Sequence, residues 1–402
     1  MAEFHLLSPR GFRAGGVHAG IKTARKSDVG LLVCDVRATA AAMFTSNKVV
    51  AAPIVVGREH VASGALRGIV VNSGNANACT RAQGRRDARE MCRVAAAELG
   101  CRPTEILPSS TGVIGHFLPM DRIRDGIARA SRDLGSTVVH ANRFADAILT
   151  TDTRRKSASA TLRIGRSRCT IAGICKGAGM IAPRLIAPHA TMLAFLTTDA
   201  LISAPALRKL LAPAVNRSFN AVTIDDHMSP NDTAVILASG MSGAKVVTIA
   251  AARSFLAALT EVCQSLAKQI AADGEGATKL VTVTVTGAPG DMDARRIARA
   301  IADSPLVKCA MNGSDPNWGR IVSAAGMCGA RFDANRTTLR LQRTRVFARG
   351  RPWPFDSARL SRALRARQVL IELECGLGAC DATIWTCDLS KGYVTINADY
   401  HT

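Results

Sequence analysis

The sequence has few aromatic residues and no long apolar run. Phe, Trp and Tyr make up 4% of its 402 residues, although 48% are hydrophobic. A membrane-spanning helix needs about 18 or more consecutive apolar residues, and no such stretch occurs. The first residues, MAEFHLLSPRGFRAGG, also lack the apolar core of a secretory signal. We therefore predict a soluble, cytoplasmic chain that does not enter a membrane and that buries a large core.

Two short motifs are absent as well. The twelve cysteines include no C-x-x-C pair, and there is no G-x-x-x-x-G-K-[ST] loop. The first absence argues against a zinc ribbon or thioredoxin-like motif, and the second excludes a P-loop nucleotide site. Cys34 and Cys263 stand inside apolar runs, where cysteine behaves as a small buried hydrophobe. We expect reduced thiols in a cytosolic protein.

Acidic residues are also scarce relative to basic ones. The chain has 52 Lys and Arg against 31 Asp and Glu, a net charge of +21. Such an excess favours anionic partners, either nucleic acid or acidic small molecules. Residues 331–367 alone hold eleven arginines and two aspartates. Because these arginines follow strand-like and helix-like patterns with few aromatics nearby, they favour a solvated basic face over a nucleic-acid-binding surface.

Helical and strand patterns alternate along the chain, which predicts a mixed α/β fold. Gly100 is placed to end the first clear helix. The expected helices are 85–100, 120–135 and 251–272, and the expected strands are 68–74, 279–287, 337–347 and 368–374.

The segment 173–200, GICKGAGMIAPRLIAPHATMLAFLTTDA, has the most chemical content. It opens with a lysine-led turn containing two glycines, where backbone can approach a ligand closely. A threonine becomes an effective nucleophile when its own freed α-amino group is the base, which requires cleavage immediately before it. Thr191 follows Ala190 beside this Gly- and Pro-rich loop. Taken alone, the residues favour an ordinary threonine that opens a helix or strand.

The same segment resembles the self-cleavage region of the ornithine acetyltransferase family, also called glutamate N-acetyltransferase. Six further stretches resemble motifs of that family in the family's order, and together they span almost the whole chain. They are PSSTGVIG (108–115), ILTTDT (148–153), SFNAVTIDDHMSPNDTA (218–234), DGEGATKL (273–280), SPLVKCAMNGSDPNWGRI (304–321) and KGYVTINADYHT (391–402).

In that family the precursor cuts its own backbone before the threonine, which is then acetylated and passes the acetyl group on. The resemblance implies a cut between Ala190 and Thr191. It gives an α chain of residues 1–190 and a β chain of residues 191–402. Thr191 is then the nucleophile, and its freed α-amino group is the general base.

The other matches concern an oxyanion hole and an amino-acid substrate. Thr111 and Gly112 match the family's oxyanion-hole pair. Lys176 can attract a carboxylate, and Glu275 can hold an ammonium group. The neighbour Thr151 stays an alternative to one member of the substrate-binding set, because the register of TTDT is open. The substrate-binding positions that the resemblance implies are Thr150, Lys176, Thr191, Glu275, Asn397 and Thr402.

Two stretches differ from the family's usual pattern. The family runs G-M-[IL]-x-P-N-M-A-T, whereas GMIAPRLIAPHAT places Thr191 four residues farther from the first proline. A longer loop costs little in folding free energy, but it bears on the strained geometry that self-cleavage needs. His189 in this loop is interpreted as solvated rather than as a contact for the scissile region. His227, Asp225 and Asp226 lie too close together to share one ion without another ligand, so we predict no metal.

The resemblance implies a mixed α/β architecture of the N-terminal-nucleophile type, with helices flanking the strands and intertwined α and β chains, usually assembled as α2β2. It implies acetyl transfer from N2-acetyl-L-ornithine to L-glutamate in arginine biosynthesis, without a cofactor. Acetyl-CoA stays open as an additional acetyl donor, and so does a related substrate in a paralogue. The rival from another class is a catalytically silent, basic paralogue that binds nucleic acid.

Overall fold

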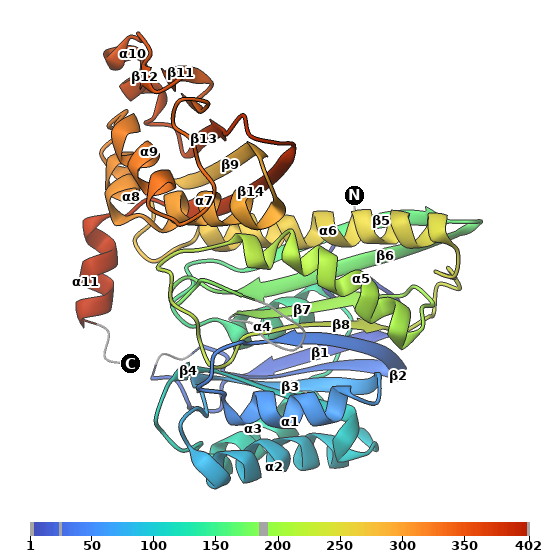
Figure 1. The fold of residues 1–402 in the computed structure, drawn as a ribbon. Coiled ribbons are helices and arrows are strands. Elements are labelled where there is room, and N and C mark those ends of the chain that lie inside the picture. Colours follow the sequence, from blue (N-terminus) through green and yellow to red (C-terminus); the bar gives the residue numbers. More distant parts are fainter. Residues whose placement is uncertain (1–3, 24–25, 185–191, 400–402) are drawn as a thin grey trace.

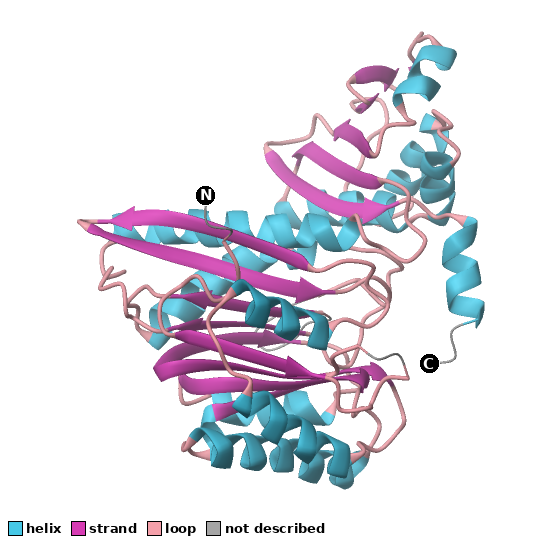
Figure 2. Ribbon diagram, turned by 180° about the vertical axis from the view of Figure 1, so that it is seen from behind, coloured by secondary structure: helices cyan, strands magenta, loops and turns pink. Residues whose placement is uncertain are grey.

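The computed structural model describes residues 4–23, 26–184 and 192–399 (Figure 1). Its strands form two sheets. The larger sheet fills the main body, and the smaller sheet and its helices form a lobe at one end, which both views show (Figures 1 and 2).

The larger sheet has eight strands in the described residues, in the order β4-β3-β2-β8-β7-β6-β5, with β1 paired to β2. Neighbours are antiparallel except for the parallel pairs β3 with β4 and β7 with β8. Strand β2 belongs to both halves of the sheet, because its first residues pair with β1 and β3 and its last residues pair with β8. The strands are β1 Phe12–Val17, β2 Val29–Phe44, β3 Ala65–Asn75, β4 Ile106–Val113, β5 Lys156–Ile164, β6 Ser167–Lys176, β7 Leu193–Thr198 and β8 Thr233–Ala238.

Helices cover this sheet on two sides, and alternate strand residues face different layers. Leu31 and Val33 pack with the helices α1 to α3, whereas Leu32 joins an inner cluster that includes Phe195. Leu196, next to Phe195, packs with α5 and α6 instead. The two sheet halves therefore share an inner core and each carries helices on its outer face. The helices are α1 Ala52–Val61, α2 Arg81–Leu99, α3 Met120–Arg132, α4 Val138–Ile148, α5 Ala204–Asn216 and α6 Ile249–Ala271, with short 3-10 helices at Pro103–Glu105 and Phe219–Ala221.

The smaller sheet has six strands in the described part of the chain, in the order β12-β11-β10-β13-β9-β14. Its helices include α11, which runs down beside the main body and ends close to it in Figure 1. The strands are β9 Leu280–Ala288, β10 Thr338–Leu341, β11 Thr344–Ala348, β12 Arg351–Pro352, β13 Gln368–Glu374 and β14 Cys380–Cys387. The helices are α7 Asp291–Asp303, α8 Pro305–Asn312, α9 Trp318–Gly326, α10 Ser357–Ala363 and α11 Lys391–Asp399.

The structure confirms the mixed α/β fold with helices that flank the strands. The expected helices correspond to α2, α3 and α6, and Gly100 ends α2 in the left-handed region with φ of 62°. The strands expected at 68–74, 279–287 and 368–374 correspond to β3, β9 and β13.

The prediction of one strand over 337–347 was wrong. The segment is a hairpin of β10 and β11 with a tight turn at Gln342 and Arg343. Both turn residues have positive φ, 46° and 64°. Non-glycine residues adopt that conformation rarely. Because the turn has no glycine or asparagine to mark it, the alternation of apolar and polar residues reads as one continuous strand.

The predicted division between residues 190 and 191 falls inside one sheet. β6 ends at Lys176, β7 begins at Leu193, and the two strands are antiparallel neighbours. An α chain and a β chain produced there would share the larger sheet and its inner core, as intertwined chains do. The division itself stays a prediction.

No helix among the described residues is long and apolar enough to cross a membrane. The arginines at 343, 345, 349, 351, 359, 362, 365 and 367 are exposed. They lie on the outer end of the small lobe, around β11, β12 and α10 in Figure 1.

Candidate active site

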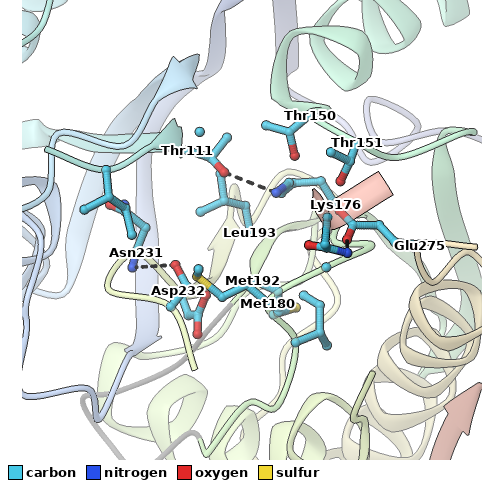
Figure 3. Close-up of a pocket in the computed structure, with 16 residues that line it drawn as sticks. Thr111, Thr150, Thr151, Lys176, Met180, Met192, Leu193, Asn231, Asp232 and Glu275 are labelled. Carbon is cyan, nitrogen blue, oxygen red and sulfur yellow. Dashed lines mark hydrogen bonds between the residues drawn. The ribbon is translucent and has the colours of Figure 1, made fainter. Parts of the chain in front are cut away.

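A pocket of about 300 Å³ lies where β4 and β6 end and β7 and β8 begin (Figure 3). Every predicted site residue that the structure describes lines it. These residues are Thr111, Gly112, Thr150, Lys176, Glu275 and Asn397.

The oxyanion-hole candidates occupy the end of β4. Thr111 is 8% exposed. Gly112 has a φ of 128°, and a Cβ atom there would lie 2.4 Å from the carbonyl carbon of Gly74 on the neighbouring strand. Only glycine fits this close approach of two backbones. The fold thus fixes the pair Thr111–Gly112 at the pocket wall.

Lys176, the last residue of β6, reaches across to this pair. Its Nζ donates a hydrogen bond of 3.1 Å to Thr111 Oγ1, which Figure 3 shows as a dashed line. Burial lowers the pKa of Lys176 below its usual value, and the Asp152 carboxylate opposes that shift. A desolvated ammonium group at this place is a strong partner for a substrate carboxylate.

A buried ionic cluster holds the Lys176 turn from behind. Asp152 Oδ1 accepts hydrogen bonds from the Gly177 amide at 2.7 Å and from Lys156 Nζ at 2.6 Å. Lys156 also pairs with Asp273 Oδ2 at 2.5 Å. The Lys156 and Asp152 side chains are 0% exposed. Burial raises the pKa of Asp152, but the lysine charges outweigh it, so the pKa is lowered overall.

This ionic cluster connects three walls of the pocket. Asp152 Oδ2 accepts from the Thr150 amide at 3.2 Å. Asp273 accepts from the Thr153 amide at 3.2 Å and stands two residues before Glu275. The segments that carry Thr150, Lys176 and Glu275 are therefore tied to one buried centre.

Glu275 and Asn397 meet at the side of the pocket next to α11. Asn397 Nδ2 donates to Glu275 Oε2 at 2.9 Å. The Glu275 amide donates to Ala178 O at 2.8 Å, and a Cβ atom on Gly179 would lie 2.4 Å from the Glu275 carboxyl carbon. Helix α11 thus brings a residue from the far end of the chain to a carboxylate that can hold an ammonium group.

Thr150 and Thr151 both line the pocket. The structure brings both hydroxyl-bearing residues to the same cavity.

Sequence reasoning missed the opposite wall, which comes from the start of β8. Ser229, Asn231 and Asp232 line the pocket together with Met192. Asn231 and Asp232 are 5% and 2% exposed. The sequence signal for this wall is NDTA, the end of the motif at 218–234. The prediction made from that motif concerned its histidine instead.

Asp225 and Asp226 hold the loop at 180–184 in the structure, and the His227 amide donates to Asp225 Oδ1 at 3.3 Å. Asp225 accepts from the amides of Met180 and Ile181 at 2.7 and 2.8 Å. Asp226 pairs with Arg184 at 3.4 Å. Within the described ranges, no group of three or more His, Cys, Asp or Glu residues could hold a metal ion.

Ala190, Thr191 and Thr402, the remaining predicted site residues, lie outside the described residues, as does His189. Met192, the residue after Thr191, is described. Its carbonyl accepts from the Thr233 amide at 2.5 Å, and it lines the pocket.

A half-buried lysine, a glycine-containing turn and a carboxylate line one small cavity, which suits a small molecule with a carboxylate and an ammonium group. The ArgJ family matches residues 13–402, and this chain belongs to that family. The arginine biosynthesis bifunctional protein ArgJ of Symbiobacterium thermophilum is 47% identical over 401 residues, covering 99% of this chain and 98% of that protein. The protein of the same name from Rhodopirellula baltica is 43% identical over 402 residues, covering 99% and 97%. The solved structure of ornithine acetyltransferase complexed with ornithine from Mycobacterium tuberculosis is 35% identical, with a TM-score of 0.41 over 45% of this chain and 96% of that chain.

Proposed function

We propose that this chain is a glutamate N-acetyltransferase of arginine biosynthesis that moves acetyl from N2-acetyl-L-ornithine to L-glutamate. The observation that carries the proposal is the convergence of residues from β4, β6, the loop after α6, and α11 on one pocket. The full-length relatives named arginine biosynthesis bifunctional protein support it.

The proposed reaction runs in two halves through acetyl-Thr191. After cleavage between Ala190 and Thr191, the threonine hydroxyl attacks the acetyl carbonyl of acetylornithine, and the freed α-amino group takes the hydroxyl proton. The carbon–nitrogen bond breaks, and the α-amino group gives its extra proton to the leaving nitrogen as ornithine departs. The amine of glutamate then attacks the acetyl ester and loses a proton to the α-amino group, which passes it to the threonine oxygen as the ester bond breaks.

Thr111 and Gly112 act in this scheme as the oxyanion hole, where donors stabilise the developing negative oxygen. Lys176 binds the substrate carboxylate. Glu275, supported by Asn397, holds a substrate ammonium group, and Thr150 and Thr402 complete the substrate contacts. Placement of Met192 in the pocket wall supports Thr191 as the nucleophile, because the two residues are joined by one peptide bond.

The proposal also covers the surroundings of the reaction. We infer a cytoplasmic enzyme of two intertwined chains assembled as α2β2, with no cofactor. Acetyl-CoA is proposed as an additional acetyl donor for glutamate, which an assay with acetyl-CoA and glutamate alone would test. The alternative of a silent, nucleic-acid-binding paralogue predicts salt-dependent retention on DNA without acetyl transfer.

The first test is the intact mass of freshly purified protein under denaturing conditions. We expect two species that correspond to residues 1–190 and 191–402. A single full-length species would mean that the longer loop before Thr191 prevents cleavage and would contradict the proposed nucleophile.

The second test is Thr191→Ala, which removes both the hydroxyl and the proposed processing. We expect loss of acetylornithine turnover with an unchanged circular dichroism spectrum. Turnover by this variant would show that another group carries the acetyl.

A further inference from the structure

Two buried oxygen atoms in the pocket wall have no hydrogen-bond partner among the described residues. They are Oδ2 of Asp232 and Oδ1 of Asn231, both in residues that line the cavity. Asn231 Nδ2 donates to Ala76 O at 2.8 Å, which fixes the orientation of this amide. Buried acceptors are rarely left unpaired, and those in a cavity wall are suited to a ligand that carries hydrogen-bond donors.

The place of these atoms indicates which part of a ligand they meet. β7 and β8 run parallel, with Leu193 opposite Thr233. Asp232 therefore stands level with Met192, and Figure 3 shows the two residues close together. The proposed nucleophile Thr191 immediately precedes Met192 in the sequence. Glu275, which accepts from Asn397, lies on the other side of Lys176 in this view.

We propose that Asp232, together with Asn231, binds the α-nitrogen of the amino-acid substrate, the atom that gains or loses the acetyl group. The assignment rests on the proposed function and extends its substrate contacts to a wall that the sequence did not indicate. A free amino acid presents three N–H donors of an ammonium group to this acceptor pair. The acetylated substrate presents one amide N–H.

The charge state of the site follows from its surroundings. Burial raises the pKa of Asp232 well above its usual value, and the Lys176 charge works against that shift. Lys176 in turn lies in the field of Asp152, Lys156 and Glu275. An arriving ammonium group stabilises the ionised carboxylate and thereby opposes the effect of burial.

Ligand pairs that differ only in the α-amino group test this assignment directly. Ornithine is compared with 5-aminopentanoate, and glutamate with glutarate, by calorimetry on the intact wild-type protein near neutral pH. No acetyl donor is present, so nothing turns over. We expect the amino acid of each pair to bind about 10- to 100-fold more tightly, as a charged hydrogen bond provides.

Asp232→Asn keeps the shape of the side chain and removes its charge. We expect it to reduce the preference for the α-amino group to less than about threefold in both pairs. Glu372→Gln is the matched control, because Glu372 Oε2 is also buried without a partner but lies in β13, outside the pocket. This control should keep the full preference.

Equal binding of the two ligands of each pair by the wild-type protein, or an unchanged preference in Asp232→Asn, would overturn the assignment while leaving the proposed function intact. Failure of the wild-type protein to bind either ornithine or glutamate would instead overturn both.

Discussion

The two sides of the pocket differ in how their buried carboxylates are partnered. On one side, Asp152 and Asp273 share Lys156 and accept backbone amides, so every segment there is tied down. On the other side, Asp232 is equally buried but keeps an oxygen that has no partner in the described part of the chain. An unpaired buried acceptor costs about 1–3 kcal/mol. The buried carboxylates of the first wall therefore find their partners within the folded chain. On the second wall, a ligand would supply the partner of Asp232.

Removing Lys156, the cation that Asp152 and Asp273 share, should have the largest effect on the difference in stability between the two walls. Lys156→Met leaves Asp152 and Asp273 buried without their ammonium partner. We expect a loss of about 3–5 kcal/mol in the free energy of unfolding, since breaking a buried pair strands its charges. Urea denaturation followed by circular dichroism measures it.

The neighbouring residue provides the control for that variant. Arg155 pairs with Asp146 at 2.6 Å, but both side chains are partly exposed, at 46% and 35%. Arg155→Met should lower the free energy of unfolding by less than about 1 kcal/mol. Equal losses in the two variants would show that the buried cluster does not stabilise the fold as described.

Neutralising Asp152, in the wall whose buried carboxylates share Lys156, should change the pH dependence of substrate binding. Lys176 attracts a carboxylate only while protonated, so this attraction is complete below its pKa and is lost as pH rises through it. The Asp152 charge raises that pKa against the effect of burial. Asp152→Asn should therefore move the alkaline rise in KM to lower pH.

The profile of KM against pH for acetylornithine, measured for both proteins, tests this expectation. A variant with a uniformly higher KM and the same alkaline limb would contradict the electrostatic link between Asp152 and Lys176. It would leave only a structural role for the carboxylate.

The smallest effect on substrate binding is expected at the exposed side of the pocket, next to α11. Asn397→Ala removes the amide that donates to Glu275 Oε2 at 2.9 Å. We expect KM to rise by about three- to tenfold with little change in kcat, because one exposed hydrogen bond contributes about 1 kcal/mol. Steady-state kinetics distinguishes this from a loss of kcat, which would place Asn397 closer to the reacting atoms.

Much of the fold was predictable from local patterns. The apolar face of α6 and the Val and Thr alternation of β9 identified both elements, because period 3.6 and period 2 report burial directly. The hairpin of β10 and β11 was not predictable, since its turn uses Gln342 and Arg343 with positive φ where a glycine or asparagine signal is usual.

The candidate site was likewise predictable only in part. Lys176, Glu275 and Thr111 were identified through motif resemblance, and the structure brings them to one cavity. Asp232 was missed although it stands in a matched motif, because nothing in the letters shows that its carboxylate is buried. Asp152 and Lys156 were missed for the same reason.

The sequence by itself indicated a mixed α/β chain and several of its helices and strands, because these follow from composition and periodicity. It indicated the family through the resemblance of its motifs. Only the tertiary structure decided that Asp152 and Asp273 share Lys156 and that Asp232 lines the pocket with an oxygen that no described residue pairs. Pairing depends on distances between residues such as Lys156 and Asp273, which are far apart in the chain and 2.5 Å apart in the fold. Burial then fixes how strongly each charge acts, since water no longer screens it.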